Sequence, residues 1–318
     1  MPQIGYQASH EQFSPSALLQ YVLFAEQAGF TCINSSDHFH PWSNAQGQSG
    51  YSFAWLGAAM QSSKLPFGVV CTPGQRYHPA IVAQAAATLA EMFPKRFWMA
   101  LGSGEALNEQ ITGDQWPRKE VRNARLLECH HVIDDLFEGK TVTHDGLVKV
   151  NQARLYTLPE EKPLVIGAAI SEATAAWMGT WADGLITISK PYAELEKVVS
   201  AFRQNGGEGK PVFLKLQLSY AKTTELARSG AWEQWKANIL SHDLLADLSQ
   251  PAQFEAAAAF VKPNDIGESV FISSDVTAHI DHINSYYPLG FQKIILHNVN
   301  KDQETFIKEF GDKVLPLL

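Results

Sequence analysis

The sequence has few groups suited to cross-linking or to metal binding. Its cysteines, Cys32, Cys71 and Cys129, are odd in number and show neither CxxC nor zinc-like spacing. Scattered cysteines of this kind are typical of reduced, partly buried thiols. We therefore expect no disulfide framework and no bound metal.

Long basic runs and long apolar runs are also missing. The formal net charge is -8, and no basic run extends beyond pairs such as Arg118-Lys119, so the chain lacks a positive stripe for a nucleic-acid backbone. No stretch approaches the roughly 18 apolar residues of a membrane span, and no charged and apolar leader pattern opens the sequence. The sequence therefore predicts a cytoplasmic protein that binds neither nucleic acid nor membrane.

The residues that are present favour a parallel α/β fold. Hydrophobic residues make up 45% of the 318 residues and charged residues 18%, an ordinary globular mixture. Short apolar runs alternate with helical patterns, as in βαβ units, and no GxGxxG motif follows the first run, which disfavours a Rossmann fold. We predict a closed (β/α)8 TIM barrel in one domain, residues 1–318, with strands at 4–6, 31–34, 67–71, 96–101, 164–168, 184–188, 212–219 and 293–297.

Two segments depart from the simple alternation, and we interpret them as insertions. The first, at about 140–160, reads as a hairpin with an Asp145-Gly146 turn. The second, at about 221–290, is too long for an ordinary connection and has a helical pattern over Trp232–Leu245, Pro251–Phe260 and Thr277–Tyr286. We expect the second insertion to cover one mouth of the barrel.

Polar residues that follow the predicted strands are the candidates for chemistry, because catalytic groups of such barrels lie at the carboxyl ends of the strands. Three clusters qualify, at residues 37–42, 71–73 and 102–108. Within them, His38 and Glu105 can exchange protons near neutral pH, as hydride transfer to or from an alcohol requires. We predict that they form an acid–base pair, and the sequence leaves open which is the acid and which the base.

A metal-dependent hydrolase is an alternative, because His38-Phe39-His40 is an HxH motif at a strand end. Such a site needs further His or carboxylate ligands from later strands. The fifth and sixth predicted strands end instead in Ala168-Ala169 and Ile188-Ser189. The sequence therefore disfavours metal hydrolysis.

Four segments carry a resemblance to a known family: Ala8-Ser9-His10-Glu11-Gln12-Phe13, Ser36-Asp37-His38-Phe39-His40-Pro41-Trp42, Thr72-Pro73 with Arg76-Tyr77-His78-Pro79-Ala80, and Gly104-Glu105-Ala106-Leu107-Asn108-Glu109. Over nearly its whole length the chain resembles the deazaflavin-dependent glucose-6-phosphate dehydrogenase group of the luciferase-like monooxygenase superfamily. The resemblance implies a flavin-type cofactor, a homodimer and a non-proline cis peptide near Val69-Val70.

The resemblance also implies roles for individual residues. Proton exchange falls to His38 and Glu105, with Trp42 beside them, and substrate contacts fall to Glu11, Trp42 and Lys190. The residues that it places around the cofactor are Asp37, Val69, Val70, Thr72, Ser103, Gly104, Asn108, Ile170, Ser171, Ala173 and Thr174.

Two departures from the family pattern alter these expectations. Where the family has a Gly-Gly pair to hold the cofactor phosphate, this chain has Ile170-Ser171 followed by Glu172, which slightly favours FMN over 8-hydroxy-5-deazaflavin (coenzyme F-420). Two of three basic residues that bind the sugar phosphate in the family are replaced near Leu245 and Ser269, and a cation near the third position remains as Lys190. We therefore predict that glucose 6-phosphate is not the substrate.

Three functions remain open from the sequence. The first is a flavin- or deazaflavin-dependent oxidoreductase that transfers a hydride between the cofactor and a small alcohol or carbonyl compound, sugar-like compounds included, but not glucose 6-phosphate. The second is a two-component FMN-dependent monooxygenase, which would need a flavin reductase as partner. The third is a cofactor-binding protein without turnover.

Overall fold

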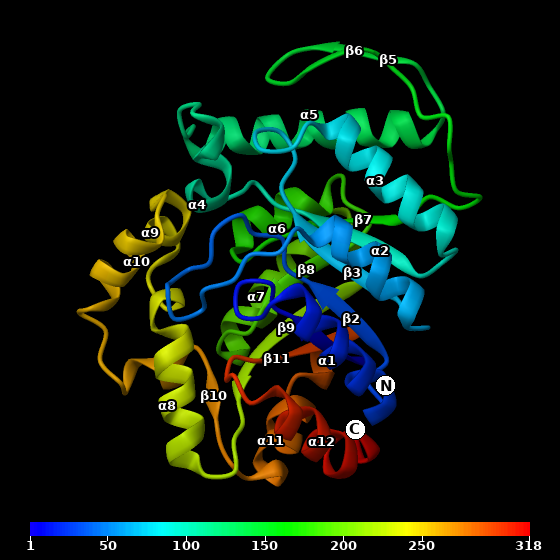
Figure 1. Cartoon of the computed structure of the whole chain (residues 1–318). Coiled ribbons are helices and arrows are strands. Elements are labelled where there is room, and N and C mark those ends of the chain that lie inside the picture. Colours follow the sequence, from blue (N-terminus) through cyan, green and yellow to red (C-terminus); the bar gives the residue numbers. More distant parts are fainter.

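The computed structural model describes the backbone of residues 1–318 and all side chains except those of residues 242 and 243. Eight parallel strands pair in a closed ring, in which the last strand returns to the first (Figure 1). The prediction of a (β/α)8 TIM barrel is confirmed. In ring order the strands are β1 (Gln3–Ala8), β2 (Cys32–Ser35), β3 (Phe67–Cys71), β4 (Phe97–Leu101), β7 (Leu164–Ala168), β8 (Leu185–Ile188), β9 (Val212–Ser219) and β11 (Lys293–Asn298).

Helices surround the ring, and their ends follow local capping chemistry. In α1 (Pro15–Ala28), the Ser14 side chain accepts a hydrogen bond from Ala17 N, and Gly29 closes the helix at a φ of 97°. These are the start and stop that the sequence predicts. The other helices of the outer layer are α2 (Ser52–Ser62), α3 (Pro79–Met92), α5 (Lys119–Phe137), α6 (Glu172–Gly179), α7 (Tyr192–Phe202), α11 (Val276–Asn284) and α12 (Gln303–Lys313).

The interior of the barrel is solid toward the amino ends of its strands. Trp98 lies across Gly68, where a Cβ atom would stand 1.9 Å from the indole. Phe213 packs against Trp98 with ring centroids 5.0 Å apart, and the rest of this interior cluster is Ala100, Ile166, Ile186 and Ile295. We call these six residues the plug. Because the plug fills the barrel, a ligand site has room only toward the carboxyl ends.

Two insertions interrupt the regular alternation, at the places that the sequence indicates. An antiparallel hairpin of β5 (Val142–Asp145) and β6 (Lys149–Ala153) projects beside α5 at the edge of the molecule (Figure 1). The second insertion follows β9. It contains α8 (Thr224–Trp235), α9 (His242–Asp247), α10 (Pro251–Ala258) and the short strand β10 (Phe271–Ile272), which pairs with β9.

The predicted helix over Trp232–Leu245 is wrong. The helix begins earlier, at Thr224, because the Thr223 side chain caps Leu226 N. It ends at Trp235, where the Gln46 side chain donates a hydrogen bond to the Gln234 carbonyl at 2.9 Å. That tertiary contact occupies an acceptor which a longer helix would use.

The second insertion covers part of the mouth, as expected. Its helices α9 and α10 lie beside α4 (Ala106–Glu109), the short helix that follows β4 (Figure 1). Glu255 on α10 accepts hydrogen bonds from Asn44 N and Nδ2, at 2.8 and 3.0 Å. Trp42 packs on Phe254. The loop after β2 therefore meets the insertion directly.

None of the helices combines the length and the apolar composition that crossing a membrane would require, among the residues described.

Candidate active site

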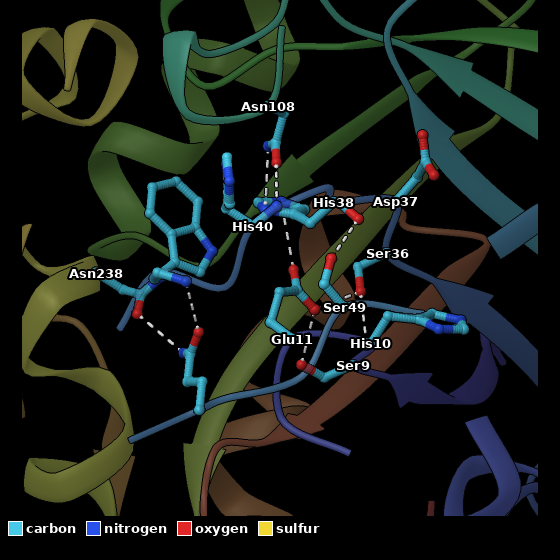
Figure 2. Close-up of polar contacts among 12 residues, drawn as sticks. Ser9, His10, Glu11, Ser36, Asp37, His38, His40, Ser49, Asn108 and Asn238 are labelled. Carbon is cyan, nitrogen blue, oxygen red and sulfur yellow. Dashed lines mark hydrogen bonds and ion pairs between the residues drawn. The ribbon is translucent and has the colours of Figure 1, made fainter. Parts of the chain in front are cut away.

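The carboxyl ends of β1 and β2 bring Glu11 and His38 together. Glu11 Oε1 lies 3.3 Å from His38 Nε2, and Oε2 accepts hydrogen bonds from the hydroxyls of Ser36 (2.5 Å) and Ser9 (3.0 Å). Figure 2 shows Glu11 below His38, with Ser9 beneath Glu11 and Ser36 beside it. The predicted substrate-facing residue Glu11 is therefore bound mainly to protein groups.

The position of Asn108 fixes the protonation pattern of the His38 ring. Its Oδ1 accepts hydrogen bonds from Phe39 N (2.9 Å) and His40 N (3.3 Å), so its Nδ2 faces His38 Nδ1 at 3.1 Å (Figure 2). An amide nitrogen can only donate, which makes Nδ1 the acceptor and places the ring proton on Nε2. His38 therefore donates from Nε2 toward Glu11.

The charge state of Glu11 supports this hydrogen bond from His38 Nε2. Burial would raise the pKa of Glu11, but His38, the Ser36 hydrogen bond and the charge of Lys215 outweigh it and lower the pKa to about 2. Glu11 is therefore ionised at neutral pH. An ionised carboxylate is the partner that an Nε2–H donor requires.

Glu105 differs from Glu11 in its hydrogen bonds and in the direction of its pKa shift. It immediately precedes α4, and its side chain makes no capping hydrogen bond. Burial raises its pKa, and the charges of His38 and Lys215 offset this only in part. A carboxyl group with a raised pKa and no capping role is suited to gain and lose a proton during a reaction.

Trp42 lies between His38 and the second insertion. Its ring lies 5.2 Å from that of His38 and 5.2 Å from that of Phe254 on α10. Only 8% of Trp42 is exposed, in a cluster with Leu107 and Ala237. The structure thus places Trp42 beside His38, as expected, with most of its surface covered by protein.

Asp37 turns away from His38 (Figure 2). Its carboxylate accepts hydrogen bonds from Ser52 Oγ (2.7 Å) and Tyr77 OH (3.0 Å), and pairs with Arg76 at 2.8 Å. Arg76 also lies 3.3 Å from Glu109, whose pKa burial raises to about 7. This buried cluster anchors the loop after β2 to the loop after β3 and to α4.

The loop after β4 is built from residues with small side chains. A Cβ on Gly102 would make only ordinary contacts, the nearest with Ala168 Cβ at 3.8 Å. Gly104 has a φ of +84°, and a Cβ there would lie 2.8 Å from Thr72 Cγ2. We call Gly102, Ser103, Gly104 and Thr72 the cradle, because their small side chains would let the backbone contact a flavin-type ring.

The expectations for β3 differ from what the structure shows. The predicted cis peptide near Val69-Val70 is wrong, because every peptide bond in the described chain is trans. Val69 is fully buried among residues that pack toward the outer helices, so its side chain does not reach the cradle. Val70 points to the barrel interior beside the plug, one layer below the cradle.

The residues predicted to hold the cofactor phosphate lie where α6 begins. Ser171 caps this helix, and its Oγ accepts from Thr174 N at 3.3 Å and donates to Thr174 Oγ1 at 2.9 Å. Ile170 is half-buried, and Ala173 is exposed. Backbone N–H groups at this helix start face solvent, where they could receive a phosphate beside Glu172.

Lys190 and Lys215 differ in whether a carboxylate of the protein lies close to the ammonium group. Lys190, predicted to bind substrate, lies 3.8 Å from Glu194 on α7. Lys215 on β9, which the sequence reasoning missed, is partly buried and interacts electrostatically with Glu11 and Glu105. The signal was present in the alternation of β9, where Phe213, Lys215 and Gln217 share one face.

The HxH motif does not form a metal site. His38 is engaged by Glu11 and Asn108, while His40 Nδ1 contacts the Leu107 carbonyl at 2.7 Å. Among the described side chains, no three His, Cys, Asp or Glu groups converge as metal ligands would.

Fold and site together define a (β/α)8-barrel enzyme with proton-transfer groups and a ring-sized cradle at the carboxyl end of the barrel. The chain belongs to the luciferase-like monooxygenase family, whose model matches residues 1–293. This agrees with the resemblance seen in the sequence motifs.

Similar proteins add detail. The F420-dependent glucose-6-phosphate dehydrogenase of Microbacterium testaceum is 33% identical, over 99% of this chain and 96% of that protein. The enzyme of the same name from Mycobacterium tuberculosis is 31% identical, over 99% of this chain and 97% of that protein. A solved F420-dependent secondary alcohol dehydrogenase in complex with an F420-acetone adduct superimposes with a TM-score of 0.91 at 29% identity, covering 100% of this chain and 99% of the other.

Proposed function

We propose that this protein transfers a hydride between a deazaflavin coenzyme and a small, unphosphorylated alcohol or the corresponding carbonyl compound. The observation that carries the proposal is the contrast between Glu105, a carboxyl group with a raised pKa and no capping hydrogen bond, and the fully hydrogen-bonded Glu11–His38–Asn108 set opposite it. One group is able to change its proton while the other set holds a fixed geometry.

The site residues divide the work of alcohol oxidation as follows. When bound, the coenzyme supplies the acceptor for the hydride that leaves the alcohol carbon. Glu105 takes the hydroxyl proton as the C–H bond breaks, and returns it to the carbonyl oxygen in the reverse direction. His38 keeps its Nε2–H on ionised Glu11 and accepts from Asn108 at Nδ1, so the ring fixes the geometry beside the reacting oxygen. Electrons and protons therefore balance without an additional reactant.

The choice of deazaflavin over FMN rests on two supports. The similar dehydrogenases named above carry F420 in their names, at identities of 29–33%. The start of α6 also keeps a capped helix end with outward N–H groups, although Ile170-Ser171 replaces the Gly-Gly pair. These observations outweigh the slight preference for FMN that the sequence suggests.

The absence of a phosphate on the substrate rests on the charge of the pocket. Leu245, near one expected basic position, packs against the apolar cluster that contains Trp42. Lys190 lies beside Glu194, which compensates its charge in part. A phosphate dianion in this pocket would lack the several charge-assisted hydrogen bonds that its desolvation demands.

The test is a titration of the purified protein with 8-hydroxy-5-deazaflavin coenzyme and, separately, with FMN, followed by fluorescence quenching. Anaerobic assays with 2-propanol and acetone then follow the coenzyme absorbance. We expect tighter binding of the deazaflavin and reversible turnover. Tight FMN binding with oxygen consumption in the presence of a flavin reductase would favour the monooxygenase instead, and binding without turnover would favour a non-catalytic role.

A further inference from the structure

Lys215 points into the barrel, toward the site. On β9, Phe213 belongs to the plug, whereas Leu214 and Leu216 pack toward the outer helices. Side chains of a strand alternate between its two faces, so Lys215 lies on the inner face with Phe213, one layer nearer the carboxyl end. Gln217 follows in the layer above.

The register of the neighbouring strands gives the depth of Lys215. It lies level with Ile188 on β8 and with Ile295 on β11. Ile295 is part of the plug, so the long lysine side chain starts at the top of the plug and extends toward the mouth. The lysine side chain therefore begins at the depth where the plug ends and the site begins.

The ammonium group of Lys215 has no protein partner. Among the described side chains, none gives it a hydrogen bond or an ion pair, and its interactions with Glu11 and Glu105 act through charge alone. Burial lowers its pKa, while the two carboxylates raise it. An ammonium group has three donors and no acceptor, and a largely buried one is costly unless an oxygen atom satisfies it.

We propose that Lys215 Nζ binds a second, uncharged oxygen atom of the substrate, so that the protein prefers hydroxy-carbonyl compounds and polyols to monofunctional alcohols and ketones. This inference rests on the proposed function and specifies its substrate class. Glu105 serves the reacting oxygen, which leaves the lysine for a neighbouring one. A hydroxyl or carbonyl oxygen accepts the hydrogen bond without adding charge.

The charges of the pocket argue against an anionic substituent. Glu11 is ionised, because its pKa is about 2, and it lies on the side of the pocket that Lys215 faces. A carboxylate placed on Lys215 would therefore also meet the negative charge of Glu11. A neutral second oxygen meets only the favourable partner.

The experiment compares acetone, hydroxyacetone and pyruvate, three substrates with the same carbon skeleton, using reduced deazaflavin coenzyme. We expect kcat/KM for hydroxyacetone to exceed that for acetone by about tenfold, and pyruvate to be the poorest of the three. In Lys215→Met the preference for hydroxyacetone over acetone should fall to about one. Lys215→Arg, which keeps the charge, should restore part of it.

Lys293→Met is the matched control. Lys293 is also a partly buried lysine of the barrel, but it lies at the amino end of β11, over the ring of Phe213. Its replacement should leave the substrate preference unchanged. Coenzyme affinity, measured by fluorescence quenching, should be the same in all variants and shows that each has folded.

Three results would overturn the inference. The first is equal kcat/KM for acetone and hydroxyacetone in the natural protein, and the second is a preference for hydroxyacetone that survives Lys215→Met. The third is an equal loss of kcat/KM with both substrates in Lys215→Met, which would mean that the lysine acts on proton transfer. If no carbonyl compound is turned over, the proposed function itself fails. Saturation-transfer NMR of 2-propanol and 1,2-propanediol binding to natural protein and Lys215→Met then tests the lysine separately, and equal binding of both compounds would refute its role.

Discussion

Two groups of polar residues in the site differ in how completely the protein satisfies them. Glu11, His38 and Asn108 are joined by hydrogen bonds that fix each group and even select the ring tautomer. Glu105, only three residues before Asn108, and Lys215 on β9 make no hydrogen bond to a described side chain and interact with the other charged groups through charge alone. Groups that are satisfied by the protein hold positions, and groups that are not are available to ligands. Each prediction below tests this division.

The largest effect is expected for Glu105→Gln. The amide keeps the shape of the side chain but cannot accept and release a proton, so kcat should fall by about 10³-fold. Coenzyme affinity should change little, which a fluorescence titration of the variant would show. Glu105 must be deprotonated to act as the base, so alcohol oxidation should be lost as the pH falls through its pKa. Because burial raises that pKa, this loss should occur above the usual carboxyl range, and it should be absent from the pH profile of the variant.

Glu208→Gln provides the control, because Glu208 is an exposed carboxylate that precedes β9, at the amino end of the barrel. Retention of more than a tenth of the activity in Glu105→Gln would assign the proton to another group.

The next effect concerns Glu11→Gln, which removes the charge that faces His38. Turnover should fall by about tenfold to 100-fold, and stability should become less dependent on pH. The folded pKa of Glu11 is lowered to about 2 from 4.5, so its charge stabilises the protein above about pH 4.5, and this stabilisation is lost as the pH falls toward 2.

Urea unfolding at pH 7, 5 and 3 measures this dependence. The difference in unfolding free energy between natural protein and Glu11→Gln should shrink as the pH falls. A difference that is the same at all three values would show that the Glu11 charge is not linked to folding.

The smallest effect is expected for Asn108→Asp. One carboxylate oxygen can still accept from Phe39 N and His40 N, while the other now accepts from His38 Nδ1 where the amide donated. The ring should then donate from Nδ1 where it accepted before, and turnover should fall about tenfold. Nitrogen-15 NMR of the histidine rings reads the change directly, and an unchanged Nε2–H tautomer would contradict the assignment.

The sequence predicts the strands of the barrel better than the side-chain contacts of the site. Eight apolar runs were sufficient to indicate the eight barrel strands, because buried parallel strands carry a strong local signal. The break after Trp235 depends on Gln46, nearly 190 residues away in sequence, so helical periodicity alone could not place it.

The same reasoning explains which candidate site residues the sequence could indicate. His38, Glu105 and Trp42 follow strand ends and could be predicted from the barrel rule. The outward turn of Asp37 toward Arg76 depends on side-chain partners from two other segments, which no motif displays. Lys215 lies inside the predicted strand at 212–219 and not at its end, so the barrel rule did not select it, and the alternation of the polar face of the strand was the available signal.

The plug of Trp98 and Phe213 has a kinetic consequence. It closes the barrel from below, so a coenzyme and its reaction partner must share one entrance. A flat ring seated on the Gly102–Gly104 cradle would be overlaid by the smaller molecule. Arrival and departure then follow a compulsory order, with the small product leaving first, and initial-rate patterns should show sequential rather than ping-pong behaviour.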